Sequence, residues 1–183
     1  MSLRQLKMLI GLSGYAQSGK DSVAEVLVRD FGFVRIAFAD KIKELLYEIN
    51  PYFGYHLKDA VDMGAGWDKV KQNPEVRRLL QTLGVGARTV FGEDFWVKQA
   101  MAQMNDPLRY DYVVTDVRFP NEMQAIWALN GKIWRVERPG IEAVNDHISE
   151  HAIKDEPVDL NINNTGTLED LEKTVHNLMR HVG

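Results

Sequence analysis

The residues best suited to chemistry form a glycine-framed loop near the N-terminus. Gly14 is followed by Gly19-Lys20 at the G-x-x-x-x-G-K spacing, in which backbone N–H groups surround phosphates and the lysine reaches the terminal ones. The general pattern continues with a Ser or Thr that binds Mg²⁺, but here Asp21 stands at that position and Ser22 follows it. The motif predicts a nucleotide site. The alternative is a structural turn that holds no ligand.

A second candidate is Asp116, which lies near the end of the apolar segment 110–117. An apolar strand that ends in aspartate is the Walker-B arrangement for Mg²⁺, and ligands of open parallel sheets bind at the carboxyl ends of the strands. Many strands end in aspartate, so this pattern has little specificity alone. Arg118 follows directly and adds a cation at the same end of the predicted strand.

A long helix is predicted after Asn73-Pro74, and the 100° step separates its faces. Four residues fall together within about 60° of arc: Arg77, Gln81, Gly84 and Arg88. Two arginines that flank an amide, beside a glycine that permits close approach, suit a phosphate and a base; the alternative is an ordinary solvated face. The predicted core stripe lies on another side: Leu79, Leu80, Leu83, Ala87, Val90 and Phe91. Glycines at 84 and 86 could instead break the helix, which would spoil the alignment.

Strands and helices must alternate to position these residues. Strands are predicted at 7–13, 33–38, 110–117, 132–137 and 158–163, and helices at about 19–29, 40–47 (capped by Asp40), 74–91, 93–104, from 120 and from 168. This order predicts an α/β fold in which a five-stranded parallel sheet has helices on both faces. Residues 51–73 are expected to be irregular and too polar for a core. Two excursions, at about 40–105 and 138–157, leave the carboxyl edge of the sheet and are expected to lie over the glycine-framed loop.

Composition narrows the class of protein. The chain has 183 residues, of which 45% are apolar, and this predicts a single domain, 1–183, with a full core. The absence of cysteine excludes disulfides, thiol nucleophiles and zinc–thiolate sites. A net charge of −4 argues against a nucleic-acid partner. No stretch predicts a membrane span and the N-terminus lacks a signal-peptide pattern, so we expect a cytoplasmic protein.

The chain resembles the P-loop nucleoside monophosphate kinases, and most closely the deoxynucleoside monophosphate kinases of bacteriophages. Five passages carry the resemblance: Ser18-Gly19-Lys20-Asp21-Ser22, Arg77-Arg78-Leu79-Leu80-Gln81-Thr82-Leu83-Gly84, Phe91-Gly92-Glu93-Asp94-Phe95-Trp96-Val97, Thr115-Asp116-Val117-Arg118-Phe119-Pro120-Asn121-Glu122, and His147-Ile148-Ser149-Glu150 with the later Asn163-Asn164. The resemblance implies the three-layer P-loop NTPase sandwich. It also implies phosphorylation of a deoxynucleoside monophosphate by ATP with Mg²⁺, in a monomer or homodimer, in the host cytoplasm if the gene is a phage's.

The resemblance also implies roles for individual residues. The ATP-binding set would be Gly14, Gln17, Ser18, Gly19, Lys20, Asp21, Ser22, Arg138, Asn163 and Thr165. The monophosphate-binding set would be Lys41, Arg77, Gln81, Arg88, Trp96, Asp116, Arg118 and Glu150. Of these, Lys20, Arg77 and Arg118 would be catalytic, since phosphoryl transfer depends on alignment and charge neutralisation. Residues 40–105 would bind the monophosphate, 138–157 would form a lid over ATP, and 163–166 would lie against adenine.

The sequence departs from the expected pattern in two places. Asp21 replaces the Mg²⁺-binding hydroxyl, so Asp21 itself, Ser22 and Asp116 are all candidates to hold the metal, directly or through water. The lid is poor in arginine: only Arg138 lies at its base, with His147, His151 and Lys154 further along. These two histidines fit either a lid function or ordinary surface positions.

Other classes of protein share parts of these patterns. Animal-type phosphomevalonate kinases are similar in the Gly-Lys-Asp and Asp-Val-Arg passages and are the nearest rival. A GTPase would need an Asn-Lys-x-Asp guanine reader, which this sequence lacks. A nucleotide-binding module without catalysis would share the loop but show no turnover that depends on an acceptor.

Overall fold

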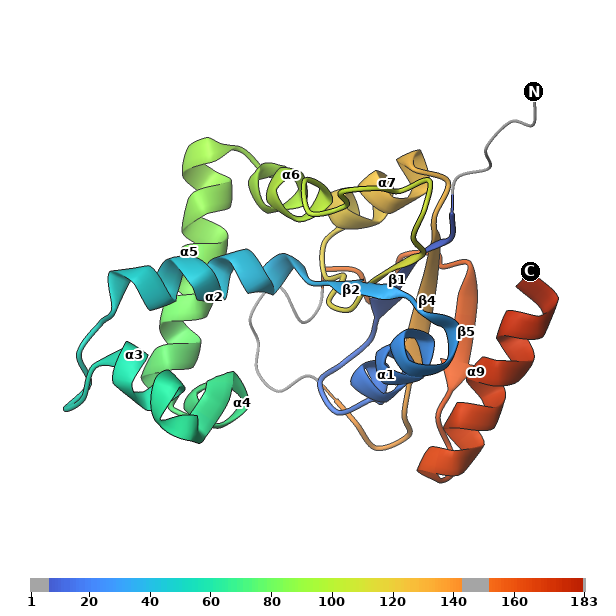
Figure 1. Ribbon diagram of the computed structural model, residues 1–183, viewed down its shortest axis with the longest axis horizontal. Coiled ribbons are helices and arrows are strands. Elements are labelled where there is room, and N and C mark those ends of the chain that lie inside the picture. The colour runs from blue at the N-terminus through green and yellow to red at the C-terminus, as the bar shows by residue number, and fades with distance from the viewer. Residues whose placement is uncertain (1–6, 143–151, 183) are drawn as a thin grey trace. The chain divides into compact units, whose positions relative to one another are not determined.

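A five-stranded sheet, parallel throughout, forms the centre of the fold in the computed structural model, which describes residues 7–142 and 152–182 (Figure 1). The strand order is β2-β3-β1-β4-β5. The strands are β1 (Leu9–Ser13), β2 (Val34–Ile36), β3 (Tyr112–Val114), β4 (Lys132–Glu137) and β5 (Leu160–Asn163). The predicted fold class is therefore confirmed.

The predicted helices occur in the predicted order, and three short helical segments that were not predicted lie within residues 57–70. The helices are α1 (Lys20–Phe31), α2 (Phe38–Ile49), α3 (Leu57–Ala60), a π-helical turn η1 (Val61–Ala65), α4 (Gly66–Val70), α5 (Pro74–Phe91), α6 (Phe95–Met101), α7 (Pro120–Ala128) and α9 (Leu168–Val182). No helix in the described ranges is both long enough and apolar enough to cross a bilayer. The chain divides into two compact units, Met1–Ala37 with Ala102–Gly183 (unit 1) and Phe38–Met101 (unit 2).

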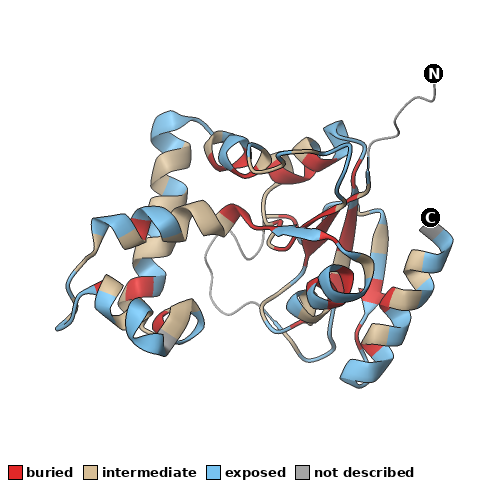
Figure 2. Cartoon of the chain, in the orientation of Figure 1, coloured by how far each residue is buried: buried red, intermediate tan, exposed pale blue. Residues whose placement is uncertain are grey.

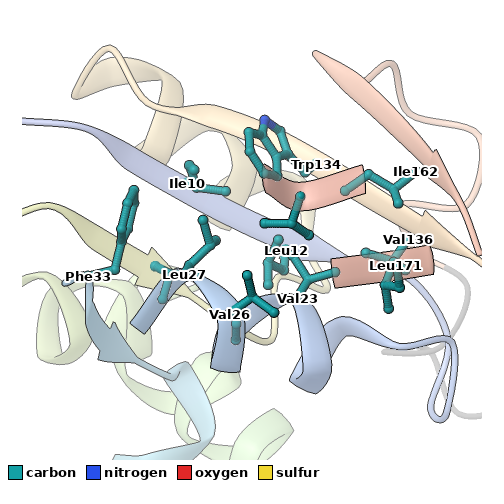
Figure 3. Close-up of a cluster of buried hydrophobic side chains, with 13 residues drawn as sticks. Ile10, Leu12, Val23, Val26, Leu27, Phe33, Trp134, Val136, Ile162 and Leu171 are labelled. Carbon is teal, nitrogen blue, oxygen red and sulfur yellow. The ribbon is translucent and has the colours of Figure 1, made fainter. Parts of the chain in front are cut away.

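Unit 1 contains the whole sheet, and its main core lies between the sheet and helices α1 and α9 (Figure 3). Every residue of β1 is buried, as expected for a central parallel strand. Ile10 and Leu12 of β1 pack with Leu27 of α1 and Leu171 of α9. Successive side chains of a strand point to opposite faces, so Gly11 faces away from this cluster.

The opposite face of the sheet is covered by α7. This helix contacts β1 and β4, and side-chain carbons of Ile126 and Ile133 would lie 2.6 and 2.8 Å from a Cβ added at Gly11. Gly11 therefore lets α7 approach closely. Helices on both faces give the three-layer arrangement predicted from the alternating pattern.

The start of α2 and the end of β3 differ from the prediction. The second helix begins at Phe38, so Asp40 lies in its first turn and is not the N-cap. The third strand ends at Val114, so Asp116 lies two residues beyond it. The backbone N–H groups of Thr115 and Val117 still bond to carbonyls of Ile36 and Leu12, which extends the strand direction past the regular ladder.

Unit 2 has a small core of its own. Leu46, Leu57, Val70 and Val76 are buried there. Figure 2 shows red, buried segments on the helices of this unit. The prediction that residues 51–73 would be irregular and contribute nothing to a core is wrong, because short helical segments place Leu57 and Val70 inside. Such short segments escape a periodicity argument, which needs several turns of helix.

Helix α5 is continuous through both of its glycines. Its Asn73 N-cap accepts a hydrogen bond from the N–H of Glu75 at 2.9 Å, as the Asn-Pro start suggested. The predicted core stripe is only partly correct: Leu79, Leu80 and Leu83 are half-buried, but Val90 and Phe91 are 72% and 66% exposed. The 18-residue helix is longer than the 12-residue α2 that packs against it, and its last turn extends past the unit 2 core.

Candidate active site

The loop between β1 and α1 has a backbone conformation that requires glycine at two positions. Gly14 has a φ of +130°, and an added Cβ would lie 2.2 Å from the carbonyl oxygen of Val136. Gly19 is the N-cap of α1 in the left-handed region, with a φ of 111°. Gln17 also has a positive φ, of 65°, and the N–H of Ser18 bonds to the carbonyl of Tyr15 at 3.2 Å. The loop is therefore a tight turn that leads directly into a helix N-terminus.

This turn is suited to binding an anion. The first N–H groups of a helix have no partner within it, and the helix dipole favours negative charge at that end. The Lys20 ammonium lies on the loop itself, where it donates to the Tyr15 carbonyl at 2.6 Å. The Ser18 hydroxyl is buried and makes no hydrogen bond within the described residues, Asp21 is exposed, and Ser22 is half-buried.

The carboxyl end of β3 lies beside this loop. The two strands are parallel neighbours in the register Gly11↔Val114, and the N–H of Val117 donates to the Leu12 carbonyl at 3.0 Å. This pairing brings Asp116 to the same edge of the sheet as the start of the loop. The structure therefore places Asp116 near the phosphate loop within unit 1, as the sequence predicted.

The backbone at Arg118 is held by a residue to which the sequence analysis gave no role. Glu122 is 4% exposed, and its carboxylate accepts hydrogen bonds from the N–H groups of Arg118 at 2.7 Å and Phe119 at 3.0 Å. Glu122 is the third residue after the Phe119 N-cap of α7. A glutamate three residues after a helix start is the usual capping signal, and it could have been found on that basis.

The segment that follows β5 lines a pocket of about 220 Å³. Its lining residues are Asn163, Asn164, Thr165, Gly166, Asp170, Leu171 and Thr174. Hydrogen bonds from the N–H and hydroxyl of Thr167 hold the pKa of the Asp170 carboxyl below its usual value, so this wall of the pocket is anionic at neutral pH. The residues predicted to contact adenine, 163–166, are thus on the wall of a pocket in the same unit as the phosphate loop.

The predicted lid begins at the end of β4. Arg138 is exposed there, and Lys154 is exposed near the far end of the segment. The guanidinium of Arg135 donates to the carbonyls of Ile153 at 2.7 Å and Glu156 at 2.8 Å, which anchors that far end to β4. Glu150, His147 and His151 lie outside the described residues.

The remaining candidates belong to unit 2. Arg77 is exposed, whereas Gln81 and Arg88 are half-buried along the same helix. Trp96 is 4% exposed, and its indole N–H donates to the Gly84 carbonyl at 2.9 Å, which ties α6 to α5. Lys41 pairs with Glu44 one turn further along α2.

Unit 1 offers a few oxygen donors for Mg²⁺. No group of three His, Asp or Glu side chains is arranged to hold a metal ion in the described ranges. Mg²⁺ is commonly held by one or two protein oxygens together with substrate phosphates, so a complete protein cage is not required. Asp21 and Ser22 in the first turn of α1, and Asp116 beside the loop, are the donors that fit this mode.

The fold and the loop together define a P-loop kinase. Among solved structures, a dephospho-CoA kinase from Campylobacter jejuni superposes with a TM-score of 0.54 at 16% identity, covering 98% of this chain and 99% of that one, which shows a shared fold. A family model described as "Deoxynucleotide monophosphate kinase" matches residues 56–175. The chain belongs to the deoxynucleotide monophosphate kinase family.

Two relatives show how far this similarity extends. The deoxynucleotide monophosphate kinase of Escherichia phage RB69 is 31% identical over 137 residues, which are 73% of this chain and 53% of the phage protein. A relative in Acanthamoeba polyphaga mimivirus is 28% identical, with 89% of this chain and 91% of the relative covered. The chain therefore spans about half the length of the phage protein and most of the mimivirus protein.

Proposed function

We propose that this chain transfers the γ-phosphoryl group of ATP to a deoxynucleoside monophosphate, which yields ADP and the deoxynucleoside diphosphate. The observation that carries the proposal is the glycine-constrained loop before α1, with Lys20 on it, in a chain of this kinase family. In the transfer, an oxygen of the acceptor phosphate forms a bond to the γ-phosphorus as the bond to the β,γ-bridging oxygen breaks.

Binding of ATP would be divided between two features of unit 1. The loop from Gly14 to Ser22 would hold the phosphates with its N–H groups and the Lys20 ammonium. The pocket lined by Asn163 and Thr165 would receive the adenine, and Arg138 would contact ATP from the base of a lid at 138–157. Asp21, Ser22 and Asp116 would hold Mg²⁺, directly or through water, and the ion would supply positive charge that neutralises the charge developing on the transferred group.

The acceptor would be aligned by arginines. Arg118 is held at the carboxyl edge of the sheet by Glu122, and a planar guanidinium can bind phosphate in a bidentate manner. Arg77 and Arg88 on α5, with Gln81, Trp96 and Lys41, would supply the rest of the monophosphate site, as would Asp116 and Glu150. No general base is needed, because the acceptor phosphate is already an anion near neutral pH.

Other properties follow as part of the same proposal. The excursion at about 40–105 would be the monophosphate-binding region of a single kinase domain. The cysteine-free composition suits a reducing compartment, so we place the enzyme in the cytoplasm, as a monomer or homodimer and without a nucleic-acid partner.

The test is a screen of acceptors with the purified chain. ATP and Mg²⁺ are mixed with each of the common deoxynucleoside and ribonucleoside monophosphates, and ADP and the new diphosphate are quantified by chromatography. Reactions without an acceptor, and with phosphomevalonate as the acceptor, are the controls. We expect equal amounts of ADP and one or more deoxynucleoside diphosphates.

Each contrary result has a definite meaning. ATP binding without acceptor-dependent ADP would overturn the proposal in favour of a binding module. Turnover with phosphomevalonate and none with nucleotides would overturn it in favour of the rival kinase.

A further inference from the structure

The side chain of Asn164 joins the end of β5 to the phosphate loop. It is 6% exposed, and its Nδ2 donates to the carbonyl oxygen of Ser18 at 2.9 Å, across 146 positions of sequence. Its backbone N–H donates to the Glu137 carbonyl at 2.7 Å, which fixes the residue to β4. The amide is therefore held from the sheet side and directed at the loop.

The next residue of the loop packs against the same side chain. A Cβ added at Gly19 would lie 2.6 Å from Nδ2 of Asn164 and 3.2 Å from Cδ2 of Leu171. Asn164 and Leu171 also line the pocket of about 220 Å³. Two residues of the pocket wall thus contact the turn that begins α1.

The hydrogen bond at Ser18 sets the direction of a phosphate-loop donor. The described peptide bonds include none that is cis, and in a trans peptide the C=O and the following N–H point to opposite sides. With the Ser18 carbonyl directed at Asn164, the N–H of Gly19 must point away from Asn164. A rotation of this peptide would lose the Asn164 bond and turn the Gly19 N–H toward the buried side.

We propose that Asn164 is a positioning residue for phosphate binding: its amide locks the Ser18–Gly19 peptide so that the Gly19 N–H faces the phosphates of the nucleotide. The proposal rests on the proposed function only in that the loop binds a nucleoside triphosphate. Because Asn164 also lines the pocket, a base bound there would contact the same side chain that holds the Ser18–Gly19 peptide. Asn164 then links the pocket to the phosphate loop. Phosphate binding depends on Asn164 even for a ligand that has no base.

The sharpest variant is Asn164→Asp, which preserves shape but replaces the N–H donor with an oxygen. An ionised carboxylate cannot donate to the Ser18 carbonyl, whereas a protonated one can. Burial raises the pKa of a carboxyl group, so lowering the pH restores a donor in this variant alone. Asn161→Asp is the matched control, since Asn161 is an exposed residue of β5, the strand that Asn164 directly follows.

The measurement is the affinity for ATP and for tripolyphosphate, which lacks a base, by titration calorimetry at pH 8 and at pH 6. At pH 8 we expect Asn164→Asp to weaken both ligands by about tenfold or more, because a buried carbonyl loses its donor and an anion stands in its place. At pH 6 the loss should shrink by several fold. Wild type and Asn161→Asp should show no such recovery.

A second variant, Asn164→Ala, provides an independent test in case Asn164→Asp does not fold. Thermal unfolding of both variants is measured to check that they are folded. We expect Asn164→Ala to weaken ATP and tripolyphosphate by the same factor at both pH values. Loss of ATP affinity alone would overturn the proposal, since Asn164 would then act on the base only, and so would unchanged affinity for both ligands. Absence of turnover in the wild-type chain, with both affinities behaving as expected, would refute the proposed kinase reaction and leave this inference intact.

Discussion

The ammonium group of Lys20 donates a hydrogen bond to the carbonyl oxygen of Tyr15 at 2.6 Å, within the loop that joins β1 to α1. This bond holds the ammonium group against the loop in which Lys20 is proposed to bind phosphate. A phosphate oxygen is a stronger partner for an ammonium group than a neutral carbonyl, because the two groups carry opposite charges and attract each other. A bound triphosphate would therefore draw Lys20 from Tyr15 at little cost.

We predict that Lys20→Ala lowers kcat by roughly 10³-fold, since one positioned charge that stabilises a transition state contributes on this scale. The measurement is diphosphate formation at saturating ATP and acceptor. The melting temperature should change little, because Lys20 is not part of the core. A variant that retains wild-type turnover would remove the phosphate-loop assignment.

Arg77 and Arg78 are adjacent in sequence but lie on different sides of α5, so substituting each one tests which side binds the acceptor. Both side chains are exposed, but the Arg78 guanidinium pairs with Glu75 at 2.5 Å, whereas Arg77 lies on the side of Gln81. We predict that Arg77→Ala raises the KM for the monophosphate by about tenfold or more, since a bidentate charged contact is lost, and leaves the KM for ATP unchanged. Arg78→Ala should change neither KM. An equal rise in both KM values for Arg77→Ala would contradict the assignment of this face to the acceptor.

Glu122 offers a test of how Arg118 is positioned. Glu122→Ala removes the acceptor of two backbone N–H groups, at Arg118 and Phe119, and we expect it to lower the free energy of unfolding by about 1–3 kcal/mol. Glu122→Gln keeps one acceptor oxygen and should lose less. Urea denaturation gives the stabilities, and Gln124→Ala, on the exposed side of α7, is the control.

The same variants should separate the effect on catalysis from the effect on stability. If Glu122 orients Arg118, then kcat at a temperature where each variant is folded should fall in the order wild type, Glu122→Gln, Glu122→Ala. Stability loss with unchanged kcat would show that Glu122 only caps the helix.

An ion-pair cluster between α1 and α9 makes a pH-dependent contribution to stability. Arg29 donates to both carboxylate oxygens of Asp30, at 2.7 and 2.9 Å, and these bonds, with a contribution from His176, lower the pKa of Asp30 to about 2. Arg29 also bonds to Glu172 of α9 at 3.2 Å. Because the pKa of Asp30 is lower in the folded chain, its contribution to stability is present above the ordinary value of 3.8 and is lost as the pH falls toward 2.

We therefore predict that Asp30→Asn lowers the melting temperature at pH 5, and that the difference from wild type shrinks between pH 3.8 and about 2. Thermal unfolding followed by circular dichroism over this range is the measurement. Asp155→Asn, at an exposed loop position, is the control and should show no such convergence with wild type. A difference that grows as the pH falls would contradict the lowered pKa of Asp30.

The local features of the phosphate loop were predictable from the sequence. The spacing of Gly14, Gly19 and Lys20, placed between an apolar run and a helical pattern, indicated the strand–loop–helix unit that the structure contains. The continuous α5 and its Asn73 start were predictable for the same reason, since capping and periodicity are properties of neighbouring residues.

Other features escaped sequence reasoning because packing decides them. The burial of Leu57 and Val70 depends on short helical segments that are too brief to show a period. Phe91 stays exposed although its ring lies 5.1 Å from the ring of Phe95 in α6, and no pattern within α5 predicts this.

Sequence patterns were enough to predict the order of strands and helices, the phosphate loop and the residue types available for charge neutralisation, because these features follow from interactions within a few residues. The distant groups that support the loop are set by long-range packing, which no local pattern predicts. Asn164 was predicted as a neighbour of adenine, but its amide bonds to Ser18, 146 positions away, and its contact explains why Gly19 must lack a side chain. The physical reason is that parallel strands bring their carboxyl ends to one edge, and the register of five such strands is set by the whole core.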